Sequence, residues 1–589
     1  MTSESTIPTA ATPDVCTTTL LLGGEEIPGQ YHVLSVLVQH EVNRIPYANI
    51  ILQDGEASKS TFPASNTALF VPGQEVEIQL GYRSRNTKVF KGVIIKHSIK
   101  MRKSASQLIL ECRDAAVKMT SGTKSKYFLE KKDSVIMEEL ITQYSGLSKS
   151  VESTQPELKE VVQYQVSDWD FLVCRAEANG QVITVEDGKI NVAKPTTSAS
   201  PALEVRYGAT LLEFDAEIDS RWQSKAIQAS SWNAADQEVL SVDAHEPQLK
   251  TGGNLQASNL AGVVGGESTE IKHGGGLLND ELQAWADGRL LRERLSKVRG
   301  RAKFQGFDKI MPGNMIKITG VGERFEGEIY VSGVRHSVAN GNWETDVQFG
   351  LSSELFSDTY AVHAQPAAGL IPAVSGLQIG IVTALESDPA GEDRIKVKLP
   401  MVSTTEDGVW ARLSTLDAGK ERGTFFRPEI DDEVIVGFLN DDPRHPVVLG
   451  MVHSSNHNAP QPATDKNHVK GYVSREKMKM TFDDEKKIMS FETPEGNKMV
   501  FSEEDKGIVI QDQNGNKITM NDSGIQIESA KDLTFKASKD VKLEGMNVEL
   551  KAQTGLKLAG TATAELSGAN VSVKGSATTV VKGGVVQIN

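Results

Sequence analysis

The sequence predicts a mainly β protein. We expect a β-rich domain of two barrel-like lobes with helices, then a small barrel, then a C-terminal intertwined triple-stranded β-helix, the whole forming a homotrimer. Three observations support this fold class. Short strand-like units repeat over the last sixty residues, five strand-like runs precede them between residues 377 and 452, and strand patterns outnumber helical patterns before residue 360.

The repeat at the end of the chain has eight units, whose starts are spaced by 8, 7, 8, 8, 7, 8 and 7 residues. Each unit carries two small or apolar residues two positions apart, and alternation places them on one face of a strand. The units are DLTFK from Asp532, DVKLE from Asp540, NVELK from Asn547, GLKLA from Gly555, TAELS from Thr563, NVSVK from Asn570, TTVVK from Thr578 and VVQIN from Val585.

A unit of seven or eight residues cannot turn the several corners of a solenoid coil within one chain. If three chains each supply one strand, about 24 residues complete a layer and three apolar faces meet on a shared axis. An ordinary β-sandwich is the alternative, and the absence of longer loops disfavours it. The predicted axial core comprises Leu533, Phe535, Val541, Leu543, Val548, Leu550, Leu556, Leu558, Leu566, Val571 and Val573.

Turn residues and composition divide the chain into five segments. The predicted segments are 1–13, disordered; 14–365, the β-rich domain; 376–456, the barrel; 457–470, a linker; and 471–589, the β-helix. Within the first domain, the glycine-rich stretch Ser241–Gly276 is interpreted as an extended connection.

Two helices in the first domain have boundary signals. In SDWDFLVCRAEANG, Ser167 and Asp170 form a capping box and Gly180 marks the end of the helix. In DSVIMEELITQY, Asp133 is the expected N-cap.

The runs QIGIVTAL, RIKVKLP, VWARLST, EVIVGFL and PVVLGMV predict a Greek-key barrel of the OB type. Its aromatics Trp410, Phe425, Phe426 and Phe438 are expected to serve the barrel core and subunit contacts rather than a nucleic-acid platform. A ladder of longer strands, MKMTFD to IQIES, follows and grades into the short repeat.

The composition favours a structural protein. From Glu495 onward there is no Pro, Cys, His, Trp or Tyr, so acid–base catalysis there could use only carboxylates or lysines. Residues 470–589 hold 17 basic and 17 acidic side chains, so the net charge of −15 comes from the rest of the chain. An acidic chain of this kind is not expected to bind nucleic acid.

The cysteines Cys16, Cys112 and Cys174 are odd in number and scattered, which is typical of free thiols made in a reducing compartment. No basic start followed by an apolar stretch marks a signal peptide, and no run of about 18 apolar residues could span a membrane. We therefore expect synthesis in a reducing compartment without a cleaved leader, and export by another route.

No catalytic, cofactor or metal site is predicted. His445, His453 and His457 lie in a loop-like stretch without a carboxylate or Cys at ligand spacing, although a metal shared on a threefold axis stays open. The glycine clusters lack the lysine and hydroxyl residue of a phosphate loop, no G-x-S-x-G elbow occurs, and Cys174 is expected in a helix core.

A glycan-degrading β-helix fibre is the enzymatic alternative. Its acid pair would be carboxylates roughly 5 to 10 Å apart, and Asp483, Asp484, Glu503 and Glu504 of the ladder could form such pairs. Their places beside turns favour solvated loop charges, so we expect no enzymatic activity.

The stretch WARLSTLDAGKERGTFFRPEIDDEVIVGFLNDDPRHPVVLG, Trp410 to Gly450, resembles the barrel of the VgrG family, the valine-glycine repeat spike proteins of type VI secretion systems. SDWDFLVCRAEANG is similar to the family's hub domain, and NKMVFSEEDKGIVIQDQNGNKITM to the start of its spike. The resemblance extends from about Cys16 to the end of the chain.

The resemblance implies a trimeric puncturing spike at the tip of the inner tube of a contractile injection apparatus, driven through a target membrane and ejected from the cell. Implied partners are an Hcp-like inner tube protein and a baseplate at the hub end, and a PAAR-type cap and effectors at the tip. Val585, Val586, Gln587, Ile588 and Asn589 are the predicted cap site. Spikes of extracellular contractile particles, tailocins and phage tails also fit the sequence.

Overall fold

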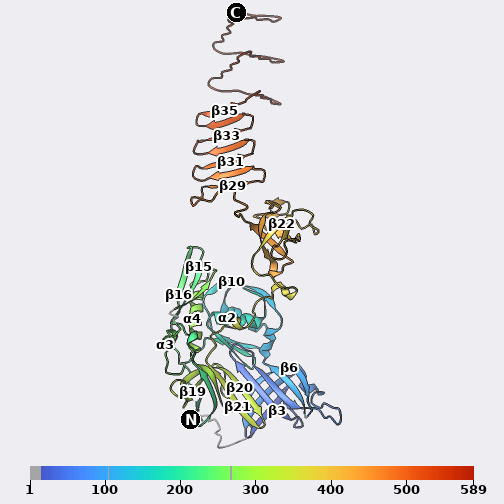
Figure 1. Ribbon diagram of the computed structural model, residues 1–589, viewed down its shortest axis with the longest axis vertical. Coiled ribbons are helices and arrows are strands. Elements are labelled where there is room, and N and C mark those ends of the chain that lie inside the picture. Colours follow the sequence, from blue (N-terminus) through green and yellow to red (C-terminus); the bar gives the residue numbers. More distant parts are fainter. Residues whose placement is uncertain (1–14, 104, 265–267, 589) are drawn as a thin grey trace. The chain divides into compact units, whose positions relative to one another are not determined.

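The computed structural model describes residues 15–103, 105–264 and 268–588, and the chain divides into two compact units. One unit contains the chain up to Leu377 together with Gly437–Val447. The other contains Gln378–Val436 and the chain from Val448 onward (Figure 1). None of the described helices combines the length and the apolarity needed to cross a membrane. The predicted disordered segment, 1–13, lies outside the described residues, and the predicted domain limits stay predictions.

A sheet of thirteen strands is the framework of the first unit. The strands follow the order β14-β18-β21-β20-β3-β4-β7-β6-β5-β1-β2, and β19 joins β20 with β13 on its other side. The bounds are β1 (Cys16–Leu22), β2 (Glu25–Glu26), β3 (Val33–Glu41), β4 (Tyr47–Gln53), β5 (Glu75–Tyr82), β6 (Arg85–Met101), β7 (Ser106–Arg113), β13 (Leu203–Arg206), β14 (Leu211–Glu217), β18 (Arg299–Gln305), β19 (Met315–Thr319), β20 (Gly327–Ala339) and β21 (Asn342–Phe349).

Two hydrophobic clusters lie on this sheet, which agrees with the prediction of two β-rich lobes. One cluster is formed by alternate residues of β1 and β3 to β7, such as Val36, Ile50 and Leu110. The other is formed by alternate residues of β13, β14 and β18 to β21, such as Ala302 and Val347. In both lobes the period-two pattern of the strands places one face in the core and the other toward solvent.

Helices and small sheets connect the two lobes (Figure 1). The helices are α1 (Asp133–Thr142), α2 (Asp168–Ala178), α3 (Ala257–Ala261), α4 (Asn279–Leu295) and α5 (Phe356–Thr359). The small sheets pair β8 (Lys124–Lys132) with β10 (Glu157–Val166), β12 (Lys189–Ala193) with β9 (Ser148–Val151) and β11 (Val182–Glu186), and β15 (Ala226–Asn233) with β16 (Glu238–Asp243) and β17 (Ser268–His273).

Helix α2 begins and ends where its sequence signals predict. The Ser167 hydroxyl accepts a hydrogen bond of 3.1 Å from the Asp170 backbone N–H and donates one of 2.7 Å to the Asp170 carboxylate. Gly180 follows the helix with a positive φ of 69°, the backbone conformation that favours glycine after a helix. Gly180 also touches α4, because a Cβ on Gly288 would lie 2.6 Å from the Gly180 Cα.

The expectation that Asp133 caps α1 was wrong. Lys132 occupies the N-cap position, and Asp133 is the first residue of the helix. Its buried carboxylate accepts two hydrogen bonds of 2.7 Å from the Arg175 guanidinium and one of 2.8 Å from the Asn179 side chain. A bidentate, charge-assisted pair with Arg175 of α2 is stronger than a hydrogen bond from a backbone N–H of α1. Asp133 therefore joins the two helices instead of capping one.

The stretch Ser241–Gly276 is more structured than the predicted extended connection. It holds the end of β16, the short helix α3 and strand β17, which pairs in parallel with β15. The glycines at 265 and 266 lie outside the described residues.

Residues 378–451 form the predicted five-strand barrel. The closed order is β22-β23-β24-β28-β27. Its strands are β22 (Gln378–Ala384), β23 (Ile395–Lys398), β24 (Val409–Leu413), β27 (Glu433–Phe438) and β28 (Pro446–Met451), with β25 (Ala418–Gly419) and β26 (Arg422–Gly423) as a separate hairpin. The core is aliphatic and comprises Val382, Ile395, Val397, Ala411, Val434, Val436 and Val448.

The expectation that aromatics fill the barrel core was wrong. Phe425 is 81% exposed and Phe426 is 56% exposed, and Trp410 and Phe438 are only partly buried. Phe425 and Phe426 lie in the loop between β26 and β27, outside the barrel strands, and alternation places Trp410 on the face of β24 opposite the buried Ala411. A role of these aromatics in subunit contacts stays a prediction.

After the barrel, the chain forms a ladder of seven antiparallel strands and then an extended segment (Figure 1). The strands are β29 (Val469–Val473), β30 (Lys479–Asp483), β31 (Ile488–Glu492), β32 (Lys498–Ser502), β33 (Gly507–Gln511), β34 (Lys517–Asn521) and β35 (Gly524–Glu528). Tight turns join them, with Gly496 and Gly515 at positive φ of 94° and 90°. We call residues 469–588 the terminal segment.

Candidate trimerisation surface and tip

The ladder has one apolar face and one polar face. In each strand from β30 to β35, two apolar side chains stand two positions apart, and the register places them opposite their counterparts on the next strand. The apolar face comprises Met480, Phe482, Met489, Phe491, Met499, Phe501, Ile508, Ile510, Ile518, Met520, Ile525 and Ile527. The other face carries small and polar residues along its middle, where the hydroxyls of Thr481 and Ser490 are hydrogen-bonded at 2.6 Å.

The described residues of the chain leave this apolar face partly exposed. Among the described residues after Val448, no apolar side chain is buried, and Ser502 is the one buried side chain. Burying a side chain the size of Met, Ile or Phe is worth about 1.5 to 3 kcal/mol. The twelve side chains are only partly buried in a single chain, so covering this face would add burial free energy to the assembly.

The eight short units that follow are also uncovered. Their predicted axial residues all remain exposed, from 51% at Val571 to 77% at Leu558, and the described residues from 530 onward form no hydrogen-bonded strand. A five-residue strand needs a neighbour to pair with its backbone groups. Since one chain supplies no such neighbour, the eight strands predicted from the sequence are extended but unpaired here, and the axial packing stays a prediction.

The predicted tip residues lie at the end of this extended segment. Val585, Val586, Gln587 and Ile588 are exposed, with Ile588 at 89%. Asn589 lies outside the described residues. Binding of a cap at these positions stays a prediction.

The four carboxylates considered for an acid pair have structural partners at the ladder turns. Asp484 forms an ion pair with Lys470, Glu503 lies 3.4 Å from Lys487, and Glu504 lies 3.8 Å from Lys486. Asp483 accepts backbone hydrogen bonds of 3.1 and 3.0 Å from the two residues after Asp484 in its own turn. These contacts stabilise the turns of the ladder.

The histidines and cysteines were considered as metal ligands and as nucleophiles. Within the described residues, no three His, Cys, Asp or Glu side chains come together as metal ligands would. Cys174 is only partly buried, contrary to the expected core position, and desolvation raises the pKa of its thiol to about 11. A thiol with so high a pKa is a poor nucleophile at neutral pH.

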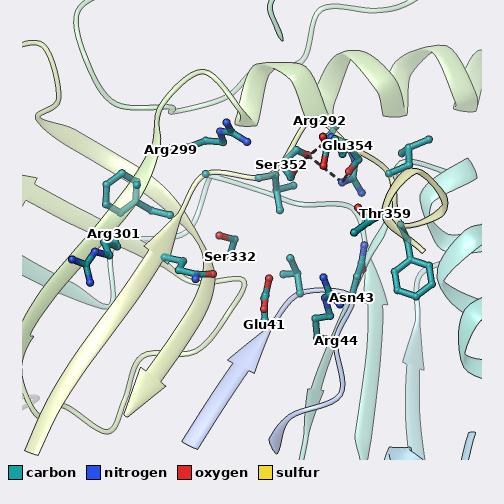
Figure 2. A pocket seen from close by; sticks show the side chains of 18 of the residues that line it. Glu41, Asn43, Arg44, Arg292, Arg299, Arg301, Ser332, Ser352, Glu354 and Thr359 are labelled. Carbon is teal, nitrogen blue, oxygen red and sulfur yellow. Dashed lines mark hydrogen bonds between the residues drawn. The ribbon is translucent and has the colours of Figure 1, made fainter. Parts of the chain in front are cut away.

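A charged cleft of about 740 Å³ lies in the first unit, where β3, β14, β18 and β21 meet α4 and the chain after β21 (Figure 2). Glu177 organises one side of it. Its buried carboxylate pairs with Arg292 and accepts hydrogen bonds of 2.7 Å from the Asn43 side chain and from the Phe356 backbone. Arg44 stacks on the ring of Tyr360 at 4.5 Å. These contacts hold the chain that leaves the thirteen-stranded sheet.

Sequence reasoning missed both the apolar face of the ladder and this cleft. The apolar face of the ladder is visible in the sequence, because runs such as MKMTF and KMVFS alternate with period two, although the predicted axial core lies in the later repeat alone. No sequence pattern indicates the cleft, since its side chains come from strands and helices that are far apart in the sequence.

Three models of known families each match a part of the chain. Residues 12–340 match the model described as the Alg8 N-terminal domain. Residues 378–453 match the type VI secretion system/phage-baseplate injector OB domain. Residues 488–589 match the phage baseplate V C-terminal trimerisation domain.

Individual relatives are spike proteins of type VI secretion systems. The chain is 23% identical over 347 residues to spike protein VgrG1b of Pseudomonas aeruginosa, covering 54% of this chain and 45% of that one. It is 31% identical over 105 residues to VgrG3 of Vibrio cholerae, covering 16% and 10%. The matched part thus spans less than half the length of these curated relatives.

Among solved structures, the chain is similar to the Escherichia coli c3393 protein, which is described as a component of the type VI secretion system similar to T4 tail proteins gp27 and gp5. The identity is 13%, the match covers 74% of this chain and 99% of that one, and the TM-score is 0.38. A score at that level does not by itself establish a common fold.

A closed five-strand barrel followed by an uncovered β segment that matches a trimerisation domain defines a baseplate hub-and-spike protein. We call the thirteen-stranded sheet with its helices the hub, and the terminal segment the spike. The chain belongs to the VgrG family of type VI secretion spike proteins, and residues 12–340 belong to the family of the Alg8 N-terminal domain.

Proposed function

We propose that this protein is the trimeric puncturing spike at the tip of the inner tube of a contractile injection apparatus of the type VI kind. The observation that carries the proposal is the terminal segment, which has an apolar face on every strand from β30 onward and no core of its own. Such a face requires partners. The match to a trimerisation domain supports two further copies of this chain as those partners.

Three ladders can turn their apolar faces toward one axis and leave their polar faces in water. The eight later units can then interlock, since each chain supplies strands that the other two lack. Opening such an assembly requires separating strands from two neighbours at once, so resistance to force is governed by a slow unfolding rate. That property suits a rod that must pierce a membrane without unfolding.

The axial packing of the tip has a direct test. Leu543→Asp places three carboxylates in one axial layer, at a cost of several kcal/mol for each buried charge. We expect loss of the detergent-resistant trimer. Glu544→Asp, next along the same unit, is the matched control and is expected to leave the trimer intact. A normal yield of resistant trimer from Leu543→Asp would refute the axial position of this side chain.

The hub end is proposed to bind an Hcp-like inner tube protein and the baseplate, and the tip to carry a PAAR-type cap and effectors. Three copies of Val585, Val586 and Ile588 at one end would form an apolar surface that a cap can cover. Truncation after Lys582 is expected to abolish cap binding while the hub still trimerises. Cap binding that survives the truncation would place the cap site elsewhere.

The puncturing role is tested in the bacterium that makes the protein. Purified particles are labelled through an affinity tag after β28, in the linker between barrel and ladder, and viewed by electron microscopy. We expect one label at one end of each inner tube. Label along the length of the tube, or no label on any particle, would contradict the proposed place of the protein at the tip of the inner tube. Particles that are cell-anchored would support a type VI system, and particles released to the medium would support an extracellular contractile particle.

A further inference from the structure

The first three strands of the apolar ladder face carry only methionine and phenylalanine on that face. In each of β30, β31 and β32, a methionine is followed two positions later by a phenylalanine. We call these six residues the Met–Phe cluster, and they are Met480, Phe482, Met489, Phe491, Met499 and Phe501. The next three strands carry isoleucine on the same face, with Met520 as the exception. The two halves of the face therefore differ in chemistry.

The register places every methionine of the cluster opposite a phenylalanine. The order of methionine before phenylalanine is the same in all three strands, and neighbouring strands run in opposite directions, so unlike side chains face each other. The facing pairs are Met480 with Phe491, Met489 with Phe482, Met489 with Phe501, and Met499 with Phe491. Facing side chains on one sheet face interact, and a thioether beside an aromatic ring is a favourable contact.

The thioethers of the cluster are accessible in the single chain. Met480, Met489 and Met499 are each partly exposed. The rings of Phe482 and Phe491 beside them are 40% and 42% exposed. In the proposed trimer, two further copies would cover the same side chains. The cluster would thus be accessible before assembly and covered after it.

A peroxide converts a methionine thioether to a sulfoxide. The O–O bond of hydrogen peroxide breaks, one oxygen forms an S–O bond, and the other leaves as water. The sulfur loses the two electrons that the peroxide gains. Methionine sulfoxide is polar, and a polar group without a hydrogen-bond partner is costly in an apolar layer. Threefold symmetry multiplies this cost, because one oxidised position in each chain brings three sulfoxides into one layer.

The thiols and the core methionines of the hub are poor targets for the same oxidant. The thiolate is the reactive form of cysteine, and burial raises the pKa of Cys112 to about 12 and the pKa of Cys174 to about 11. Cys16 is buried, and desolvation raises the pKa of its thiol as well. The fully buried methionines of the hub are Met119, Met137 and Met315. The cluster is therefore a packing surface that a peroxide reaches while these groups are protected.

We propose that the three thioethers of the Met–Phe cluster are an oxidation site that controls assembly of the spike. Hydrogen peroxide converts them to sulfoxides in chains that have not yet assembled, and such chains cannot pack their ladders on a common axis. Assembled spikes are protected, because each ladder is covered by two others. The inference rests on the proposed trimeric spike and adds a chemical condition to its formation, since only chains with reduced methionines enter it.

The first test treats the assembled full-length protein with hydrogen peroxide. Peptide mass spectrometry measures the sulfoxide content of each methionine over time. Met401 in the barrel is 90% exposed and is the internal reference. Since oxidation follows exposure, we expect Met480, Met489 and Met499 to oxidise at least about tenfold more slowly than Met401. Equal rates would mean that the face is open in the trimer, and would contradict both this inference and the axial packing of the proposed spike.

The second test follows oxidation before assembly. The full-length chain is produced in bacteria that lack methionine sulfoxide reductases, with and without hydrogen peroxide in the medium, and monomer and trimer are separated by size. We expect peroxide to lower the yield of trimer. Sulfoxide at Met480, Met489 and Met499 should be found in the monomer and be at least about tenfold rarer in the trimer. Sulfoxide at Met401 should be equally frequent in both and confirms that peroxide reached the chain.

A leucine variant separates the cluster from the other methionines. Leucine has nearly the volume of methionine and no sulfur to oxidise, so the exchange is well tolerated in apolar packing. The variant carries Met480→Leu, Met489→Leu and Met499→Leu, and its yield of trimer should be the same with and without peroxide. The matched control carries Met119→Leu, Met137→Leu and Met315→Leu in the hub core, and should stay as sensitive to peroxide as the unchanged chain.

Each failure has a distinct meaning. A cluster variant that loses its trimer to peroxide like the unchanged chain, or a hub variant that is protected, would overturn the inference and leave the trimer standing. Cluster sulfoxides that are as frequent in the trimer as in the monomer would do the same. A monomer from the unchanged chain without peroxide would contradict the proposed trimer itself.

Discussion

The hub and the spike are both built from strands with period-two alternation, and they differ in what covers the apolar face. In β3 of the hub, Val36 and Val38 are almost fully buried by residues of the same chain. In β32 of the spike, Met499 and Phe501 have the same spacing and stay partly exposed. Alternation identifies a face that must be buried, but it does not identify the molecule that buries it.

This difference separates two kinds of stability. The hub can fold as one chain, because its clusters are complete. The spike depends on association, so its stability should rise with protein concentration, as for any state that binds a partner. Changes on the apolar face of the ladder should therefore disrupt assembly, while changes in the hub core should disrupt folding.

The largest effect is expected from Ile518→Asp on the apolar face of β34. Three buried carboxylates in one layer would each cost several kcal/mol, enough to abolish the trimer. Thr519→Asp, the next residue on the opposite face, is the control and should leave the trimer intact. Light scattering measures the mass, and so the number of assembled copies, of each variant. If the two variants assemble equally well, the apolar face of the ladder is not the face that packs against the other copies.

Acid should unfold the hub before the spike. Burial lowers the pKa of His336 to about 3 and also lowers the pKa of His40. An unfolded histidine takes up a proton near pH 6.5, whereas the folded His336 resists until about pH 3. The stability from its neutral form is therefore intact above pH 6.5 and lost as the pH falls toward 3, by a few kcal/mol.

The measurement for this effect is tryptophan fluorescence across the acid range, because five of the six tryptophans precede residue 350 and none follows Trp410. The spike has no histidine after His468, so its detergent resistance should persist at a pH where the hub has unfolded. His336→Gln should shift the hub transition to lower pH. An unchanged transition would show that other groups, such as paired carboxylates, control it.

A smaller effect is expected from Gly288→Ala in α4. The new methyl group would lie 2.6 Å from the Gly180 Cα, and the backbone there cannot turn aside as a side chain could. Overpacking of this kind costs about 1 to 3 kcal/mol. Thermal unfolding should show a less stable hub and an unchanged spike. Alanine by itself favours a helix over glycine by about 1 kcal/mol, so a more stable hub would show that the backbone relieves the clash.

The smallest effect is expected from Lys479→Ala at the rim of the ladder. Its ammonium lies 3.5 Å from Glu492, and both side chains are nearly half exposed. Exposed pairs contribute at most about 1 kcal/mol. The dissociation temperature of the trimer should hardly change. A loss as large as that from Ile518→Asp would mean that the polar side of the ladder also lies in an interface.

Local features of the fold followed from the sequence because neighbouring residues determine them. The Ser167 cap, the Gly180 stop and the strands of the barrel and ladder all lie where their patterns predict. The errors arose where a distant residue decides the outcome. Asp133, for example, binds Arg175 of another helix instead of its own backbone.

The sites divide in the same way. The apolar face of the ladder could have been read from alternation, since it depends only on which side chains share a face. The charged cleft around Glu177 could not, because its lining depends on the order of strands in the sheet. Sequence patterns give the strands, and the tertiary fold alone decides which edges remain unpaired.

The mass of the full-length chain in solution is the most direct test of the trimeric spike. Light scattering should give three times 63.9 kDa, and an unboiled gel in detergent should show the same species, which falls to the monomer on boiling. That result would mean that two further copies cover the terminal segment. A folded monomer at micromolar concentration would mean that the apolar face is covered in some other way, and the trimeric spike would be wrong.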